Sequence, residues 1–473
     1  MFNKRVILCA ALIAVVAVHA LDHPRLSPQL FGTVYDRFAK ARGAVEPQYF
    51  SQVIDHTQGP QSATFKQRFY EVKDYWQAPT GPIILYIAGE APQEHAAGID
   101  DEVSVIAKQN KALVLTLEHR YFGKSMPFED LSTPHLKYLT IAQVLEDLNS
   151  FVVWYQRERI NAVYNTTTRN KALCVGGSYA GMVSSHLRYV HPETFDVAWS
   201  SSGVVDAVFN FTTFDLQVAV SVGQECADVL RQATERVEEL LQTRNSYVKK
   251  LFHAEDMSDD DLMWMLSDAE TLPPQYGMEA ALCKPMTAAH QAGQDLAVAF
   301  AKFCESTFYP QFCAGAGPQL YSDKLMQDVN ASTAYSGQRA WWWYCCNELA
   351  YAQTYPGEIG IRSPRITLDF HKRKCDAVYG PGIWPPNTAA FNKKYGGKHP
   401  KTTNVVYLNG SQDPWQWAAV RTSPDMKRLP AYVLNGPSIA HCHDLSKETP
   451  KDPDNVKAGR RAAEDFVRSI LSA

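Results

Sequence analysis

The sequence has 473 residues, of which 45% are hydrophobic and 20% charged, and its formal net charge is −4. This length exceeds what one hydrophobic core usually fills, so we expect a large domain with an insertion or a second domain. The composition excludes a disordered or fibrous chain, and the mild acidic balance gives no reason to expect nucleic acid or an anionic membrane as a partner.

The first 20 residues have the parts of a secretory signal peptide. Lys4 and Arg5 precede an apolar run over residues 6–18, and a small residue, Ala20, stands at the expected cleavage position. The run is shorter than the ~20 residues that span a bilayer, so residues 1–20 predict a cleaved leader rather than a membrane anchor. We therefore expect a protein of the secretory pathway, lysosomal or extracellular.

The first half of the mature chain alternates apolar runs with helical patterns. Apolar runs over 81–90, 112–120, 172–178 and 195–203 predict buried strands, as in a parallel sheet covered on both faces. Residues 140–155 have apolar side chains three and four apart, which predicts a helix. The alternation over 64–76 predicts an antiparallel edge strand. Strands that alternate with helices indicate an α/β fold.

The pattern changes after residue 205. Long helical patterns separated by Pro- and Gly-containing loops occupy residues 206–385, and strand signals resume at 404–415 and 431–445. We predict a core in two parts, residues 21–205 and 386–473, interrupted by a helical, disulfide-rich cap domain over 206–385.

Cysteines and sequons agree with a secreted chain. Without Cys9 of the leader, nine cysteines remain, an odd number that leaves at least one free thiol or an intermolecular bridge. Cys174 lies in an apolar run and should be buried and reduced, whereas most others lie between residues 226 and 375. Four Asn-x-Ser/Thr sequons are permissive glycosylation signals. They are Asn165, Asn210 and Asn330, which we take as candidates, and Asn409.

The turn after the third apolar run carries a serine. Residues 176–180 read Gly-Gly-Ser-Tyr-Ala, so Ala180 stands where the G-x-S-x-G motif has its last glycine. An apolar strand precedes Ser178 and a helical pattern follows it, which is the setting that a hydrolase nucleophile requires. The alternative is a glycine-rich turn without catalytic importance.

Partners for this serine follow two later strands. Asp413 and His441 come after consecutive strand-like runs, in the order Ser, Asp, His that α/β hydrolases use. Ser178 would be the nucleophile, His441 the base and Asp413 its orienting carboxylate. His443 competes as the base, but residues two apart in an extended loop point to opposite sides. The alternative interpretation is that Asp413 is an aspartate that caps a turn and that His441 is a histidine of a surface loop, neither with a catalytic role.

An oxyanion hole would need two backbone N–H groups. We assign them to Tyr179 and to Glu90, in the loop that follows an early strand, where Gly89 would let the backbone approach a substrate. No metal-ligand spacing, P-loop or dinucleotide motif is present, so we expect no metal and no cofactor.

Several motifs together resemble one known family. In chain order they are "AGEAP" (88–92), "LEHRYFGKSMP" (117–127), "GGSYAG" (176–181), "WYCCNEL" (343–349), "NGSQDPW" (409–415) and "AHCHDL" (440–445). The chain resembles the serine peptidase family of lysosomal Pro-X carboxypeptidase, dipeptidyl peptidase II and thymus-specific serine protease, and most of all the thymus-specific branch. The resemblance implies an α/β-hydrolase core with a large helical cap insertion and a triad of Ser178, Asp413 and His441.

The resemblance also implies an activity. The enzyme would be a serine exopeptidase that cleaves peptides after proline through an acyl-enzyme, as a Pro-X carboxypeptidase or a dipeptidyl peptidase. Trp415 and the aromatic run over residues 341–344 are candidate walls of the substrate pocket, although aromatic residues more often serve cores. From these and the loop after the first apolar run, we take Trp415, Trp343 and Gly89 as the pocket residues. Glu118, His119 and Arg120 should form a buried structural set. An esterase or lipase on the same fold, or a non-catalytic binding protein, are the alternatives, and a homodimer stays open.

Overall fold

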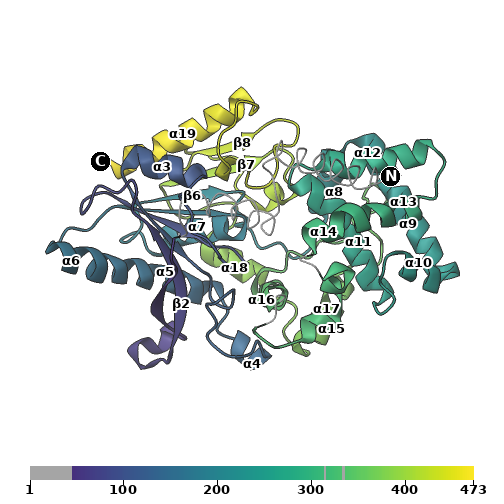
Figure 1. The fold of residues 1–473 in the computed structure, drawn as a ribbon, viewed down its shortest axis with the longest axis horizontal. Coiled ribbons are helices and arrows are strands. Elements are labelled where there is room, and N and C mark those ends of the chain that lie inside the picture. The colour runs from purple at the N-terminus through teal and green to yellow at the C-terminus, as the bar shows by residue number, and fades with distance from the viewer. Residues whose placement is uncertain (1–44, 314–315, 333–335) are drawn as a thin grey trace, which may run out of the picture.

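A computed structural model describes residues 45–313, 316–332 and 336–473, so the predicted leader lies outside the described residues. Eight strands form one sheet in the order β1-β2-β4-β3-β5-β6-β7-β8 (Figure 1). The strands are β1 (Gln48–Val53), β2 (Thr64–Val72), β3 (Ile83–Ile87), β4 (Leu113–Leu117), β5 (Ala172–Gly177), β6 (Val197–Ser201), β7 (Val405–Gly410) and β8 (Ala431–Leu434). The strands from β4 to β8 are parallel, whereas β1 pairs with β2 and β2 with β4 in antiparallel fashion.

The prediction of an edge strand over 64–76 was wrong in position. Strand β2 is antiparallel, but it lies between β1 and β4, and β1 forms the edge. The sequence of β1, "QYFSQV", has too few apolar residues to stand out, although it pairs along its whole length with β2.

Helices cover both faces of the sheet, as the apolar strands predicted. On one face, Ile84, Val114 and Leu173 pack beneath α3 (Glu102–Asn110) and α19 (Asp454–Leu471). On the other, their neighbours Leu85, Leu115 and Cys174 pack against α5 (Ile141–Trp154) and α7 (Tyr179–Val190). This alternation is the two-residue period of a strand buried on both sides. The molecule has an α/β-hydrolase fold, in which helices cover both faces of a mostly parallel sheet.

The remaining helices lie mainly between β6 and β7 and form the cap at the right of Figure 1. They are α8 (Thr212–Val222), α9 (Gln224–Thr243), α10 (Asn245–Leu251), α11 (Asp259–Gln275), α12 (Glu279–Gln291), α13 (Leu296–Phe303), α14 (Tyr309–Phe312), α15 (Asp323–Gln327), α16 (Ser336–Tyr344) and α17 (Leu368–Tyr379). Further short helices are α4 (Thr133–Leu136), α6 (Ala162–Tyr164) and α18 (Thr388–Tyr395). No helix of the described ranges is long and apolar enough to cross a membrane.

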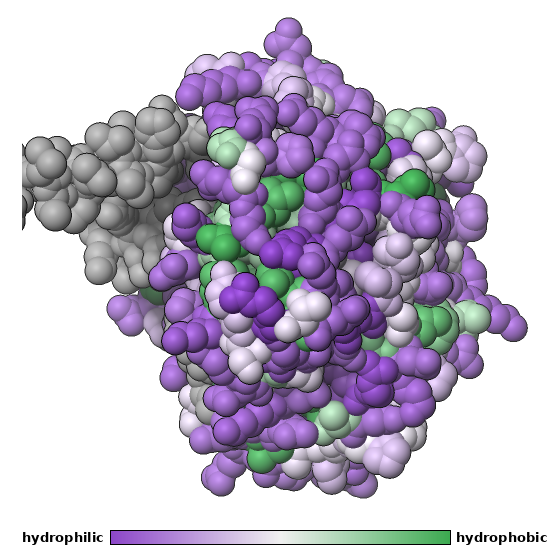
Figure 2. All heavy atoms as spheres, turned by 90° about the vertical axis from the view of Figure 1, so that its right-hand side faces the viewer, coloured by the Kyte–Doolittle hydropathy of each residue, from purple (hydrophilic) through white to green (hydrophobic). Residues whose placement is uncertain are grey.

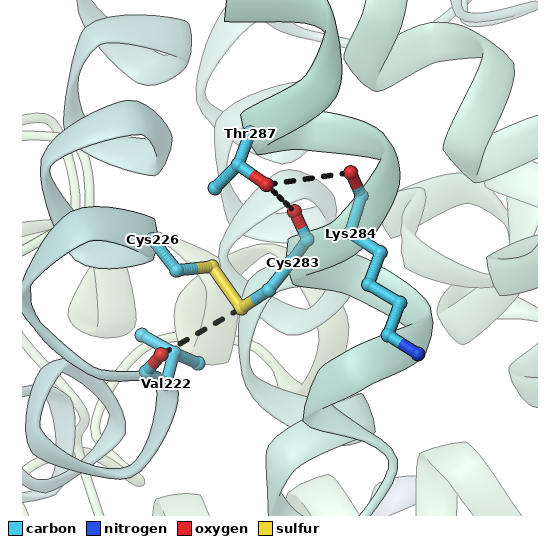
Figure 3. The surroundings of a disulfide bond; sticks show 5 residues. All are labelled: Val222, Cys226, Cys283, Lys284 and Thr287. Carbon is cyan, nitrogen blue, oxygen red and sulfur yellow. Dashed lines mark hydrogen bonds between the residues drawn. A yellow bond between two sulfur atoms is a disulfide. The ribbon is translucent and has the colours of Figure 1, made fainter. Parts of the chain in front are cut away.

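Two disulfides fasten this helical region, in agreement with the sequence. Cys226 of α9 is bonded to Cys283 of α12, and Figure 3 shows the bridge between the two helices. Cys346, just after α16, is bonded to Cys375 of α17. Cys174 is buried and free, as predicted. The disulfides therefore lie in the cap, whereas the sheet depends on its apolar core.

A set of buried ion pairs involves the segment that follows β4. Arg68 Nη2 lies 2.6 Å from Glu118 Oε1, and Arg120 Nη2 lies 2.6 Å from Asp147 Oδ1. The expected buried ion pairs are thus present at Glu118 and Arg120, and His119 Nε2 lies 2.8 Å from the Tyr179 hydroxyl. Since removing one partner would leave a buried charge uncompensated, they fix the loop that follows β4.

The four asparagines of the sequons differ in their exposure to solvent. Asn165, Asn210 and Asn330 are exposed, but Asn409 is 1% exposed and its amide donates to the Val420 carbonyl. Asn409 therefore cannot carry a glycan in the folded chain. The cap-side face in Figure 2 is mostly hydrophilic, with apolar side chains in small separate groups.

Candidate active site

Ser178 occupies a strained turn between β5 and α7. Its φ of 61° and ψ of −125° lie in a region that non-glycine residues rarely adopt. The turn is held by two backbone hydrogen bonds, from Ser178 N to the Ser201 carbonyl (2.9 Å) and from Met182 N to the Ser178 carbonyl (3.0 Å). Strain of this kind projects the serine out of the sheet, as in a nucleophile elbow.

Two glycines of the turn are required because backbone carbonyl oxygens lie too close to them for a side chain. A Cβ on Gly176 would lie 2.2 Å from the Ala180 carbonyl oxygen, and one on Gly181 would lie 2.6 Å from the Ser201 carbonyl oxygen. Both positions therefore exclude any side chain. Ala180 is 2% exposed, and its methyl group is accommodated because Gly176 has none. The departure from the G-x-S-x-G pattern thus leaves the turn intact.

The side chains of His441 and Asp413 contact each other, and each residue follows one of the last two strands of the sheet. His441 Nδ1 lies 2.8 Å from Asp413 Oδ2, and the two side chains are 4% and 0% exposed. Burial lowers the pKa of His441, but the Asp413 carboxylate and Cys442 raise it more, so that the pKa lies well above its ordinary value. This pair is the arrangement that orients a base histidine and stabilises its protonated form.

His443 faces another part of the core. Its Nε2 lies 3.6 Å from Asp452 Oδ1, and its backbone carbonyl accepts a hydrogen bond from Arg460 of α19. The two histidines therefore point to different partners, as the extended-loop argument predicts. Only His441 contacts Asp413.

The serine and histidine turns are in contact. A Cβ on Gly177, the residue before Ser178, would lie 2.8 Å from Cys442 Sγ, the residue after His441. In the described part of the chain no hydrogen bond joins the Ser178 hydroxyl to His441. Such contacts are often long in substrate-free hydrolases and shorten on binding.

Gln275, the last residue of α11, connects the cap to the loops that carry His441 and Asp413. Its backbone carbonyl accepts from His441 N (3.0 Å), and its side-chain Oε1 accepts from Trp415 Nε1 (3.0 Å). Trp415 N in turn donates to Asp413 Oδ1 (2.9 Å). The position of the histidine and of the aspartate thus depends partly on the cap.

A cavity of about 100 Å³ opens beside Ser178. Its lining comes from the core and from the cap: Glu90, Ser178, Val204, Gln275, Tyr276, Trp341 and Trp415. The Tyr276 and Trp415 rings are centred 6.2 and 6.5 Å from the His441 imidazole, so the base lies close to this cavity. The volume is below the ~300 Å³ of a typical ligand pocket, which leaves room for one compact side chain.

Two of the predicted pocket residues need correction. Trp343 does not line the cavity, because its Nε1 donates to the Leu139 carbonyl and its ring packs on Tyr379. Trp341 lines it instead, since residues two apart on α16 point about 200° apart around the helix. Gly89 is not among the residues that line the cavity, although the adjacent Glu90 is.

Of the two predicted oxyanion donors, Glu90 lines the cavity and Tyr179 directly follows Ser178, which also lines it. Helix α7 begins at Tyr179, so the Tyr179 N–H has no partner within the helix. Glu90 follows β3 and lines the cavity. Burial raises the pKa of the Glu90 carboxyl, while its own backbone N–H and His441 act in the opposite sense.

Several residues near the site were missed in the sequence. Val204, Gln275 and Tyr276 line the cavity, and no sequence motif marks them. Trp341 belongs to the run over 341–344 that we considered as a wall, but the sequence does not show which ring of that run faces the cavity.

Comparison with known proteins gives consistent matches. The chain matches the protein family described as Serine carboxypeptidase S28 over residues 52–463. It is 34% identical over 399 residues to "Probable serine protease EDA2" of Arabidopsis thaliana, covering 82% of this chain and 79% of that one. It is 26% identical over 421 residues to "Thymus-specific serine protease" of Mus musculus (82% and 80%). It is also 25% identical over 401 residues to "Probable extracellular serine carboxypeptidase" of Arthroderma benhamiae (74% and 55%).

Proposed function

The chain belongs to the serine carboxypeptidase S28 family and is a serine-type peptidase, and from this premise we propose that Ser178, Asp413 and His441 are its catalytic triad. The observation that carries the proposal is the 2.8 Å contact of His441 with Asp413 in a loop that touches the residue before Ser178. The strained backbone of Ser178 is additional support.

In the proposed reaction His441 Nε2 accepts the proton of the Ser178 hydroxyl while Oγ attacks the scissile carbonyl carbon. The carbonyl oxygen becomes an oxyanion, which the backbone N–H groups of Tyr179 and Glu90 stabilise. The tetrahedral intermediate collapses as His441 donates the proton to the departing amine, leaving an acyl-enzyme. Water then attacks the ester carbonyl while His441 accepts one of its protons. The second tetrahedral intermediate collapses as His441 returns that proton to Ser178 Oγ, which breaks the ester bond, releases the acid and restores the serine hydroxyl.

We further propose that the residue before the scissile bond is proline. A pyrrolidine ring is compact and apolar, and the small cavity beside Ser178 has the walls Trp341, Trp415, Tyr276 and Val204. Aromatic faces are suited to such a ring, and the volume disfavours long side chains. The protein would act in the secretory pathway, where its disulfides are stable.

Two measurements test this function. A fluorophosphonate probe, which reacts with activated serines, should label the purified protein, and Ser178→Ala should abolish the labelling. A panel of peptides that differ only before the scissile bond should then show the highest kcat/KM with proline. Labelling that survives in Ser178→Ala would exclude the proposed nucleophile, and preference for leucine or phenylalanine would exclude the proline assignment.

A further inference from the structure

The side chain of Tyr179, the residue after Ser178, is tied to a segment that takes no part in the proposed reaction. Its hydroxyl lies 2.8 Å from His119 Nε2, and the two residues are 0% and 4% exposed. Resting on the proposed function, we propose that His119 is a positioning residue that holds the Tyr179 backbone N–H where the oxyanion forms. His119 would then act on the reaction without contacting the substrate.

The neighbours of His119 determine its tautomer. Its Nδ1 lies 2.6 Å from the Arg120 carbonyl oxygen, which can only accept a hydrogen bond, so Nδ1 carries the proton. Burial lowers the pKa of His119 to about 4, although the Arg120 carbonyl and Asp147 act in the opposite sense. The ring is therefore neutral at neutral pH, and its Nε2 is an acceptor. The Tyr179 hydroxyl consequently donates to Nε2, which fixes the direction of this hydrogen bond.

His119 is itself fixed by the segment that follows β4. The carbonyl that binds its ring belongs to Arg120, which is buried and paired with Asp147. The Nη1 of Arg120 also donates to two backbone carbonyls of other segments, at 3.0 and 2.8 Å. A hydrogen bond to a ring held in this way restricts the position of the Tyr179 side chain.

Helix α16 of the cap completes the surroundings of Tyr179. The Tyr344 hydroxyl lies 3.4 Å from the same His119 Nε2, and the rings of Tyr344 and Tyr179 are centred 5.2 Å apart. Trp341, one turn earlier on α16 and a wall of the cavity, packs edge-on against the Tyr179 ring with centroids 6.0 Å apart. The side chain of Tyr179 is thus held by the core and by the cap together.

The strained turn needs supports of this kind. Ser178 has a φ of 61°, and a residue keeps such a conformation only where the surrounding structure holds it there. Tyr179 follows directly, so the direction of its N–H depends on the same turn. Misplacing a catalytic group by about 1 Å can lower the rate by roughly 100-fold, because an oxyanion donor must lie within about 2.7–3.1 Å of the developing charge. Loss of the bond to His119 should therefore weaken the transition state more than substrate binding.

The test compares two esters of one proline-ending peptide on the full-length protein, an ordinary ester and the thionoester, in which sulfur replaces the carbonyl oxygen. Sulfur is larger and accepts hydrogen bonds weakly, so the thionoester gains little from a well-placed donor. We expect His119→Leu to lower kcat/KM of the oxygen ester by about 10- to 100-fold and to leave that of the thionoester nearly unchanged. His119→Gln, whose side-chain oxygen still accepts from Tyr179, should keep most of the wild-type ratio. Tyr179→Phe removes the same hydrogen bond with little change in volume and should lower the ratio as well.

Tyr121→Phe is the matched control. Tyr121 is 1% exposed and lies two residues after His119, but its hydroxyl donates to the His135 carbonyl rather than to the serine turn. This substitution removes a tyrosine hydroxyl of the same segment and should keep the wild-type ratio of the two esters. Titration with a fluorophosphonate counts the reactive serines of each preparation, so a partly unfolded variant is not mistaken for one with a displaced donor.

Several outcomes would overturn the inference. They are equal losses on both esters in fully titrating His119→Leu, a wild-type ratio in fully titrating Tyr179→Phe, or a fall in Tyr121→Phe as large as that in Tyr179→Phe. The Tyr179→Phe result decides the matter if His119→Leu does not fold. A failure of the proposed function looks different, because then the fluorophosphonate labels no serine in the wild type.

Discussion

Replacing His441 by alanine should remove the base of the reaction while leaving the fold in place. Loss of one triad member typically lowers turnover by about 10⁴- to 10⁶-fold, which corresponds to roughly 5 to 8 kcal/mol of transition-state stabilisation. The matched replacement is His443→Ala, two residues away, because His443 is also buried but contacts Asp452 rather than Asp413. We expect His443→Ala to change turnover by less than about tenfold, or 1.4 kcal/mol.

The structure also gives the expected effect on stability. In His441→Ala the fully buried Asp413 loses the imidazole but keeps the hydrogen bond from Trp415 N at 2.9 Å. Leaving the buried Asp413 carboxylate without its charged partner costs about 3–5 kcal/mol, which does not exceed the 5–15 kcal/mol of a typical domain, so the variant should still fold. In His443→Ala, Asp452 keeps its ion pair with Arg460, so the loss should be similar or smaller.

The assay measures the rate of fluorophosphonate labelling and the hydrolysis of a dipeptidyl-proline amide on purified variants. Circular dichroism shows whether each variant is folded. A His443→Ala variant that is inactive but folded, beside an active His441→Ala variant, would refute the assignment of the base. Equal losses in two folded variants would also refute it.

Three further predictions follow from the same geometry. Ala180→Gly should keep its fluorophosphonate labelling rate, whereas Ala180→Leu, which places three more carbons in a packed turn, should lose labelling or fold; a fully active leucine variant would contradict the elbow. Because the pKa of His441 lies well above its usual value and the base must be neutral, kcat/KM should rise with pH above 6.5, and Asp413→Asn should move that limb to lower pH; a maximum near pH 5 would disprove this reasoning. Burial and the neighbouring Glu464 raise the pKa of Glu102 to about 9 from 4.5, so the folded state retains a proton that the unfolded state loses, and stability falls as pH rises between these values. Glu102→Gln should therefore raise the melting temperature at pH 8.5 and leave it nearly unchanged at pH 4, and calorimetry that shows equal shifts at both would reject the explanation.

Much of the core could be predicted because its information is local. Near-continuous apolar runs indicate strands buried on both faces, and the residue at the end of each strand reaches the catalytic edge of the sheet. Ser178, Asp413 and His441 could therefore be proposed from their positions after strands. Strand β1 could not, because "QYFSQV" is stabilised by pairing with β2 rather than by its own pattern.

The cavity walls could not be predicted because they depend on rotation and on long-range packing. The run over 341–344 consists of aromatic residues without a break, so its sequence does not show that Trp341 faces the cavity and that Trp343 faces Leu139. Gln275 and Tyr276 lie at the end of α11, which contains Pro273 and Pro274. Their contact with the His441 loop depends on where the whole cap rests, which no local motif encodes.

The double attachment of Gln275 has a consequence for how the enzyme can be modified. The backbone carbonyl of residue 275 holds His441, and any amino acid supplies that carbonyl, whereas the bond to Trp415 needs an acceptor in the side chain. A substitution of Gln275 would therefore disturb the loop that carries Asp413 more than the loop that carries His441. Exchanging the cap for that of a relative would not transplant specificity alone, because the graft would also have to rebuild the support of the base.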